Sequence, residues 1–404
     1  MTRAERGWGR TIAACFLGYI VQAVVNTFAP LLFLTFESEF SISLSQISLL
    51  ITCNFGVQLL IDLLSARWVD RIGYRTSIVA AHFFAAAGLA GLSFLPDLFS
   101  DAYLGLLVSV VLYAIGGGLT EVLVSPIMEA CPTRRKAAAM GLLHSFYCWG
   151  LVFVVLASTL FFRLAGIARW RTLALLWAIL PAANGVFFLT VPIGSLTGED
   201  VPAMKLPQLL RQRAFWVLLL LMLCAGASEQ AVCQWASAFA ESGLHVSKTV
   251  GDLAGPCAFA LLMGIGRLIF ARLSDRGISR LLAVSGAGCI ASYLLISLSP
   301  WPALSLAGCA LCGLSVAAMW PGVFSIAAKT LRAGGTALFA LLALAGDLGC
   351  GGGPTYAGLM AGAFGGDLKT GILFSLIFPA GLLLGLAALG RAARDGSVQP
   401  PASV

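Results

Sequence analysis

The strongest constraint in this sequence is a succession of long apolar stretches that contain almost no charged residues. Of the 404 residues, 59% are hydrophobic and only 11% are charged, and the mean hydropathy is +0.94. A soluble globular chain carries about 25% charged residues, and a helix needs about 20 apolar residues to cross a bilayer core of ~30 Å. The chain is therefore expected to cross a membrane many times, which excludes soluble enzymes, nucleic-acid binders and disulfide-stapled secreted proteins.

Twelve apolar stretches have the length of a membrane span. They lie at about 11–36, 46–66, 75–96, 103–130, 137–162, 172–194, 215–240, 250–273, 280–299, 302–328, 335–362 and 370–390.

The longest polar connection, 195–214, divides these stretches into two sets of six. We predict an all-α membrane protein with twelve transmembrane helices in two six-helix halves, 1–194 and 215–394. The connection is expected to be a central cytoplasmic loop, and 395–404 a short cytoplasmic tail. The first stretch is predicted to be a retained helix, because it has span length and lacks the small-residue cleavage pattern of a signal peptide.

The distribution of basic residues predicts the orientation in the membrane. Cytoplasmic loops carry an excess of Lys and Arg. Nineteen of the 25 basic residues fall on the side of the N-terminus and five on the other, with Arg267 inside a span. Both termini are thus predicted to be cytoplasmic, in an inner or plasma membrane. Three arginines between the fifth and sixth spans, Arg163, Arg169 and Arg171, run against this pattern.

The residues that usually carry covalent or metal chemistry are sparse. Most of the eleven cysteines lie inside apolar stretches, where they are expected to act as small apolar side chains. With three histidines, no metal site or other cofactor is expected, and no Gly-x-x-x-x-Gly-Lys-Ser/Thr loop for nucleotide phosphates occurs. The net charge of +7 is spread over short loops, which does not indicate nucleic acid binding. We therefore expect that the protein is not an enzyme and that an ion or solute gradient supplies its energy. We also expect it to act as a monomer.

The two halves share a sequence repeat at an offset of 205 residues. Ala-Arg-x-x-Asp-Arg occurs at 66–71 and again at 271–276, each time at the predicted cytoplasmic end of the second span of its half. A match of this many residues with the same topology indicates that the halves are related.

The segment 65–75 resembles the loop motif of the major facilitator superfamily. Asp70, Arg71, Gly73 and Arg75 match that motif, which begins with Gly where this chain has Ser65. The resemblance implies two six-helix halves that rock against each other to transport a solute by alternating access. It also suggests an ionic latch between the halves, although plain positive-inside charge explains the same residues. The latch candidates are Asp70, Arg71, Arg75, Arg267, Asp275 and Arg276.

Two acidic residues inside spans are candidates for proton coupling. An ionisable side chain in the hydrocarbon core costs at least ~2.5 kcal/mol and therefore calls for a reason. Glu121 follows three glycines in the fourth span, and a desolvated carboxyl group there can take up and release a proton near neutral pH. Asp347 opens a glycine run that either bends as a gating hinge or packs tightly against another helix. A structural hydrogen bond is the alternative for Glu121.

Polar side chains inside several spans are candidates for contacts with a polyhydroxyl solute. Amides supply donors and acceptors, and an indole offers a flat apolar surface to a sugar ring. The alternative for each one is a hydrogen bond between helices. The candidates are Gln22, Asn26, His144, Tyr147, Glu229, Gln230, Gln234 and Trp235.

Within the superfamily the chain looks most like the fucose–galactose–glucose proton symporters. The resemblance rests on Glu121 with Pro126, on 144–146 and on the first span at 18–30. It implies that Glu121 takes part in proton coupling. The chain departs from this branch at Asn26, where the branch has an acid, and at Tyr147, where it has an asparagine.

These observations predict proton-coupled uptake of a small polar solute such as a sugar. A drug–proton antiporter, an organic-anion exchanger and a transporter-like sensor or lipid-handling protein are the alternatives.

Overall fold

The computed structural model describes residues 3–132, 136–194, 206–273, 277–331 and 335–394. For 3–7, 66–68, 70, 136–141, 206, 271–273, 335–337 and 392–394, only the backbone is described. The chain divides into two compact units, Met1–Gly198 and Glu199–Val404. The boundary between the units falls inside the polar connection 195–214.

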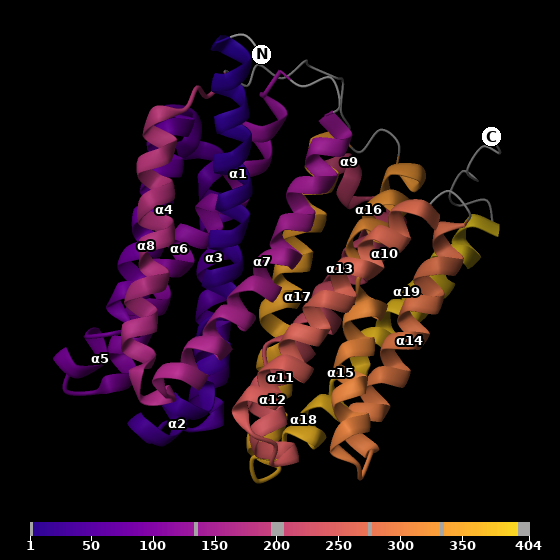
Figure 1. The fold of residues 1–404 in the computed structure, drawn as a ribbon. Helices are drawn as coiled ribbons and strands as arrows, with labels where there is room; N and C mark the ends of the chain where they lie inside the picture. The colour runs from indigo at the N-terminus through magenta and orange to yellow at the C-terminus, as the bar shows by residue number, and fades with distance from the viewer. Residues whose placement is uncertain (1–2, 133–135, 195–205, 274–276, 332–334, 395–404) are drawn as a thin grey trace. The chain divides into compact units, whose positions relative to one another are not determined.

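The N-terminal unit is built of helices that run side by side (Figure 1). Helix α6 packs against α3 and α4, α4 also packs against α8, and α1 contacts α6, α7 and α8. The elements are α1 (Arg3–Thr27), η1 (Ala29–Leu32), α2 (Phe33–Phe40), α3 (Leu44–Ile72), α4 (Tyr74–Gly91), α5 (Leu95–Leu98), α6 (Ala102–Glu129), α7 (Lys136–Ala165), η2 (Ile167–Arg169) and α8 (Trp170–Thr190).

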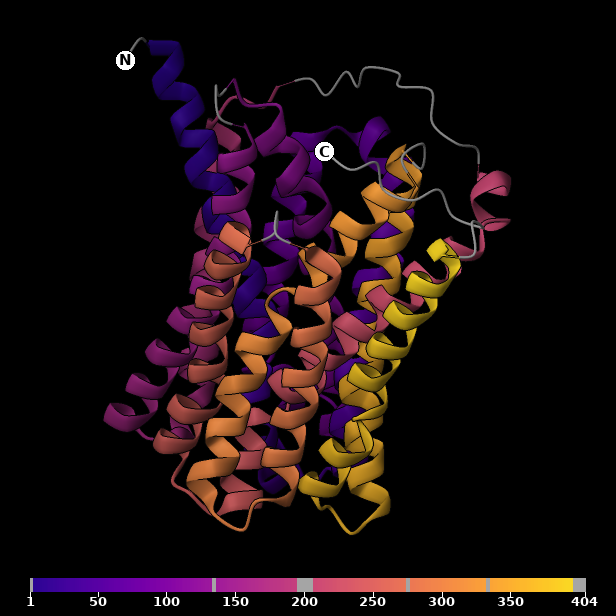
Figure 2. The ribbon, with the colours of Figure 1, turned by 90° about the vertical axis from the view of Figure 1, so that its right-hand side faces the viewer.

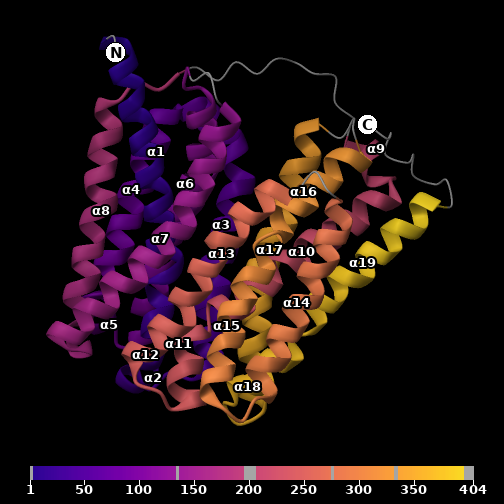
Figure 3. The same ribbon diagram turned by 45° about the vertical axis from the view of Figure 1, so that its right-hand side comes forward.

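In the C-terminal unit, all of the secondary structure in the described residues is also helical (Figures 2 and 3). Helix α10 packs against α17 and α19, and α15 packs against α13 and α14. The elements are α9 (Leu206–Leu210), α10 (Arg213–Cys233), α11 (Ala236–Ala238), η3 (Phe239–Gly243), α12 (Lys248–Asp252), η4 (Leu253–Cys257), α13 (Ala258–Leu273), α14 (Ile278–Leu298), α15 (Pro302–Val316), α16 (Met319–Thr330), α17 (Gly335–Ala363), α18 (Leu368–Phe374) and α19 (Ile377–Arg394).

Eleven helices of the described part of the chain are long and apolar enough to cross a membrane. The remaining predicted span corresponds to α4, a helix of 18 residues. It packs between α6 and α8 and carries Arg75 and His82. The predicted all-α class with twelve helices in two halves is thus confirmed.

The first span of each unit is broken beside a pair of amide side chains. In the N-terminal unit α1 ends at Thr27, one residue after Asn26, and a 3₁₀ turn that contains Pro30 follows. In the C-terminal unit α10 ends at Cys233, beside Gln234, and a π-helical turn follows at Phe239–Gly243. A break frees backbone polar groups, and such breaks inside a membrane lie where protein or water can satisfy those groups.

Local sequence signals fix several helix ends. Ser43 caps α3, because its hydroxyl accepts from the Gln46 backbone while the Gln46 side chain accepts from the Ser43 backbone. Gly73 lies between α3 and α4 with φ +92°, a conformation that favours glycine. The loop motif at 65–75 therefore ends one helix and starts the next.

The glycine run of α17 is a packing face. A Cβ atom on Gly349 would lie 2.0 Å from the Leu223 carbonyl oxygen, and one on Gly353 would lie 2.5 Å from the Ala227 carbonyl oxygen. Helix α17 continues without interruption through Pro354. Of the two sequence-based interpretations, tight packing against α10 is the one that the structure supports.

None of the eleven cysteines, all of which lie in the described residues, forms a disulfide bond, and nine of them are buried. This matches their expected role as small apolar side chains.

Candidate functional site

Polar side chains gather between α1, α3, α6 and α7 of the N-terminal unit. The Gln22 amide nitrogen donates to Glu121 Oε2 at 3.0 Å and to Gln58 Oε1 at 2.9 Å. The Gln58 amide nitrogen donates to Asn26 Oδ1 at 2.9 Å, and the Asn26 amide nitrogen donates to the Tyr147 hydroxyl at 3.4 Å. The predicted residues Gln22, Asn26, Glu121 and Tyr147 thus belong to one continuous network.

Two members of this network, Asn54 and Gln58, are absent from the sequence-based prediction. Asn54 donates to Asn26 Oδ1 at 3.2 Å and accepts from Gln58 at 2.9 Å, and both side chains are buried. They stand four residues apart in the apolar stretch that forms α3, so they share one face of that helix. The same spacing singled out Gln22 and Asn26, so this signal could have found them.

The network packs closely and leaves one polar atom unpaired. Gln22 is only 3% exposed, and its Oε1 atom is buried without a hydrogen-bond partner in the described residues. A Cβ atom on Gly117 would lie 3.1 Å from that oxygen and 3.3 Å from Gln58 Cδ. Glu121, in contrast, is exposed. An exposed carboxyl group is therefore held by the buried amide of Gln22.

His144 takes part in a second group of polar contacts in the same unit. The Tyr19 hydroxyl lies 3.2 Å from His144 Nδ1 and 3.1 Å from the Ser125 hydroxyl. Tyr19 precedes Gln22 by one turn of α1, and Ser125 follows Glu121 by one turn of α6. His144 is exposed and lies beside the amide network, one turn along these helices.

The predicted polar residues of the C-terminal unit form their own cluster in α10. Gln234 donates to Gln230 Oε1 at 3.0 Å, and Gln230 donates to Glu229 Oε1 at 3.2 Å. All three side chains are buried, and Glu229 lies within electrostatic range of Arg267 in α13. The cluster therefore joins an acid, two amides and a nearby cation.

Trp235 and Asp347 take other positions. The Trp235 indole is fully buried and donates to the Pro354 carbonyl at 2.8 Å, which ties the end of α10 to α17. This contact gives Trp235 a packing role. Asp347 lies in the middle of α17 and is half-buried.

The latch candidates are described in part. Arg75 donates to the carbonyl oxygens of Phe188 and Leu189 at 2.8 and 3.0 Å, at the C-terminal end of α8, where a cation is favoured. Arg71 is exposed in the last turn of α3. Asp275 and Arg276 lie outside the described residues, as does the side chain of Asp70.

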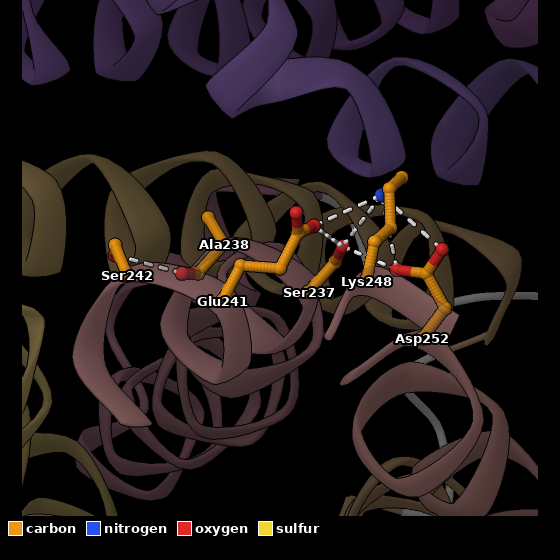
Figure 4. A network of polar contacts seen from close by, with 6 residues as sticks. All are labelled: Ser237, Ala238, Glu241, Ser242, Lys248 and Asp252. Carbon is orange, nitrogen blue, oxygen red and sulfur yellow. Dashed lines mark hydrogen bonds and ion pairs between the residues drawn. The ribbon is translucent and has the colours of Figure 1, made fainter. Parts of the chain in front are cut away.

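A further charged cluster, not predicted from the sequence, lies in the C-terminal unit (Figure 4). Lys248 Nζ lies 3.0 Å from Glu241 Oε1 and 3.2 Å from each carboxylate oxygen of Asp252. Ser237 donates to Asp252, which is fully buried. Glu241 lies within one π-helical turn, Phe239–Gly243, and a second, Leu253–Cys257, begins directly after Asp252; such turns are frequent at functional sites.

Among the described residues, no group of His, Cys, Asp and Glu side chains is arranged to hold a metal ion.

Comparison with known proteins places this architecture in a family. The model of the Major Facilitator Superfamily matches residues 12–354. "Membrane protein MosC" of Rhizobium meliloti is 29% identical over 287 residues, which cover 70% of this chain and 67% of that protein.

Solved structures share the fold at low sequence identity. A bacterial homolog of the human lysosomal transporter Spinster, inward-facing and unoccupied, matches with a TM-score of 0.76 and 16% identity over 100% of both chains. The nucleoside transporter NupG matches with a TM-score of 0.72 and 14% identity, over 96% of this chain and 100% of that one. The Escherichia coli fucose:proton symporter FucP matches with a TM-score of 0.63 and 16% identity, over 94% of this chain and 98% of that one.

The family match over most of the chain, the repeated loop motif and the helical fold lead to one conclusion: this multi-pass membrane protein belongs to the Major Facilitator Superfamily of transporters.

Proposed function

We propose that this protein is a secondary active transporter that takes up a small polar solute, such as a sugar, together with protons by alternating access. The observation that carries the proposal is the contact between Glu121 and Gln22, in which an exposed carboxyl group is held at 3.0 Å by a buried amide. A carboxyl group inside a membrane span is costly and marks proton or solute pathways. Glu121 is the proposed proton site, and Asp347 is a second candidate in the other unit.

The chemistry of the network supports a solute rich in hydroxyl groups. Amides and hydroxyls present both donors and acceptors, which a polyhydroxyl solute requires. The proposed contacts are Asn26, Tyr147 and His144 in the N-terminal unit and Glu229, Gln230 and Gln234 in the C-terminal unit. Two proteins of the same fold are named for fucose and for nucleosides, which also carry several hydroxyl groups.

The ionic latch remains part of this proposal. Arg71 and Arg267, with Asp70, Asp275 and Arg276 of the repeated loops, are proposed to hold one state of the transporter. Rocking of two related halves must break and reform such pairs. Arg75 contributes by anchoring α4 to the end of α8. We place the protein in the inner or plasma membrane with both termini in the cytoplasm.

The first test follows external pH in a weakly buffered, de-energised suspension of cells that express the protein. Pulses of individual sugars are added, and symport of a substrate is expected to make the medium more alkaline. Glu121→Gln should abolish this signal, because an amide cannot take up a proton at this pH. Glu129→Gln is the matched control, since Glu129 is an exposed carboxyl group at the end of the same helix.

Two results would count against the proposal. A Glu121→Gln protein that still concentrates its substrate against a gradient would remove Glu121 from proton coupling. Silence across the sugar panel would turn attention to organic anions and lipophilic cations, the substrates expected of an exchanger or a drug antiporter.

A further inference from the structure

The amide nitrogen of Gln22 is committed to two acceptors. It lies 3.0 Å from Glu121 Oε2 and 2.9 Å from Gln58 Oε1, so each of its two N–H groups has a partner. The Gln22 carbonyl oxygen, in contrast, is buried beside Gly117 without a hydrogen-bond partner in the described residues. A buried, unpaired carbonyl oxygen costs free energy. The arrangement therefore keeps both donors of Gln22 in use at the expense of its acceptor.

Turning the Gln22 amide over would not remove this cost. Its carbonyl oxygen would then face two other oxygens, Glu121 Oε2 and Gln58 Oε1, while its nitrogen would lie beside Gly117. Gln58 is held in its own orientation, because its nitrogen donates at 2.9 Å to both Asn26 Oδ1 and Asn54 Oδ1. The ionised Glu121 and the oxygen of Gln58 thus make Gln22 a donor toward the carboxylate.

A proton can join Glu121 without disturbing this contact. In the described part of the chain, the hydrogen bond to the carboxyl group reaches Oε2 and leaves Oε1 available. If the proton binds Oε1, Oε2 becomes the carbonyl oxygen of a carboxylic acid and still accepts from Gln22. If the proton bound Oε2, an O–H would meet an N–H at 3.0 Å, and Gln22 would have to turn its oxygen toward that of Gln58. Oε1 is therefore the oxygen that takes the proton with the amide contacts unchanged.

We propose that Gln22 is a positioning residue that keeps Glu121 Oε2 occupied and thereby directs the proton to Oε1. The proposal rests on the proposed function, in which Glu121 takes up a proton. Gln58 acts through Gln22, because its oxygen fixes the amide that meets the carboxylate.

This role of Gln22 has a consequence for the solute. Glu121 is an exposed side chain, and only one of its oxygens is held by the protein in the described residues. A protonated Oε1 can donate a hydrogen bond to an oxygen atom of the solute, whereas an ionised Oε1 can only accept. The proton and a solute oxygen then bind together at one atom, which is the condition for their transport in the same direction.

Other titratable side chains lie on the helices that pack against α6, which are α1, α3, α4, α5 and α7. Tyr19 contacts His144, His82 contacts Asn184, and Asp97 on α5 pairs with Arg171. Asp62 stands one turn beyond Gln58 on α3 and is also a carboxyl group, so its titration must be separated from that of Glu121. In the middle turns of α1, α3, α4 and α7 the titratable side chains nearest to the network are Tyr19, Cys53, Asp62, His82, His144, Tyr147 and Cys148.

The test records infrared spectra of the purified full-length protein in lipid vesicles over a range of pH, without any solute. The carbonyl band of protonated Glu121 is identified by its loss in Glu121→Gln. In the wild type this carbonyl oxygen is Oε2, which accepts from Gln22, and a hydrogen bond lowers the stretching frequency of a carbonyl group. In Gln22→Met the band should therefore move to higher frequency. The pH midpoint of the band should also rise by about 1 unit, because the ionised carboxylate loses a charge-assisted hydrogen bond.

Gln58→Met tests whether Gln58 acts through Gln22. It should raise the pH midpoint less than Gln22→Met does, because Gln22 still reaches Glu121 but is no longer held. The double variant should have the midpoint of Gln22→Met alone, since the effects of residues that act through one contact do not add. Gln22→Ala, which introduces no bulk, replaces Gln22→Met if that variant does not fold.

Asn54→Leu is the matched control, because it removes a buried amide from the same face of α3 while Gln58 still donates to Asn26. It should leave the frequency and the midpoint of the band unchanged.

The outcomes separate the role of Gln22 from that of Glu121. A band that keeps its frequency in Gln22→Met would place the proton on Oε2, and one that keeps its midpoint would show that Gln22 does not act on the ionised form. Either result would overturn the role of Gln22 and leave Glu121 as the proton site. A carboxyl band that is unchanged in Glu121→Gln would assign the titration to another group, such as Asp62, and would overturn the proposed proton site as well.

Discussion

A count of basic residues along the sequence does not show which partners a given charged side chain has in the folded protein. Arg171 lies in the first turn of α8 and is one of the three arginines that run against the predicted orientation. It pairs with Glu39 and, at 3.1 Å, with Asp97, and it lies 4.7 Å above the Trp170 ring. The charge of Arg171 is therefore balanced within the N-terminal unit.

At the same scale, Gly117 provides the space that the amide network occupies. In Gly117→Ala the new Cβ would lie 3.1 Å from Gln22 Oε1, so both amides must shift. We expect a loss of stability of about 1–3 kcal/mol and weaker solute-dependent proton uptake. Gly56→Ala is the control, because nothing lies within 4 Å of its Cβ position. Thermal unfolding in detergent measures the first effect and the external pH assay the second; equal behaviour of the two variants would contradict the assignment.

Pairs of helices depend on close backbone approach, and α10 with α17 is the clearest case. In Gly349→Ala the Cβ would lie 2.0 Å from the Leu223 carbonyl oxygen, a backbone atom that cannot rotate away. We expect the variant to lose about 1–3 kcal/mol, measured by unfolding in detergent. Gly352→Ala, three residues along the same helix, has open space and should be neutral or more stable by up to about 1 kcal/mol. A stable Gly349→Ala protein would argue that α17 bends or slides at this point.

Lys248 in α12 forms ion pairs with Glu241 in η3 and with Asp252 in its own helix (Figure 4). The lysine therefore links η3 to α12. Lys248→Met would leave the fully buried Asp252 without its cation and beside Glu241. Breaking a buried ion pair from one side costs about 3–5 kcal/mol, and a shift of the unfolding midpoint would report it. Lys369→Met is the control, since Lys369 contacts a backbone carbonyl of Ser299 at 3.1 Å. If both variants unfold at the same midpoint, the cluster contributes little to the stability of the C-terminal unit.

For the whole molecule, the orientation in the membrane is the property with the simplest test. Nineteen of 25 basic residues lie on the predicted cytoplasmic side. A green fluorescent protein fused after Val404 should therefore fluoresce in bacterial cells, and alkaline phosphatase at the same place should be inactive. The reverse pattern would place both termini outside and would overturn the predicted direction of uptake. A phosphatase inserted between α14 and α15 is the positive control, because that connection is predicted to face outward.

The class, the spans and the family of this protein could be predicted from its sequence alone. A membrane span requires about 20 consecutive apolar residues, and this information is local in the chain. The loop motif at 65–75 and its repeat are local in the same sense. Helix α4, which lies between α6 and α8 and carries Arg75 and His82, is the one predicted span that is not among the eleven described helices long and apolar enough to cross a membrane.

The contacts that join the polar residues into networks became visible only in the folded protein. Gln22 meets Gln58 across 36 positions and Glu121 across 99, and Asn26 meets Tyr147 across 121. Such contacts depend on the rotation and packing of whole helices, which the apolar pattern of a membrane span does not encode. The same reason explains Trp235, which offers a surface for a sugar in the sequence but is buried against Pro354 in the fold. It also explains the glycines of α17, whose role as a packing face became visible only when α10 was placed against them.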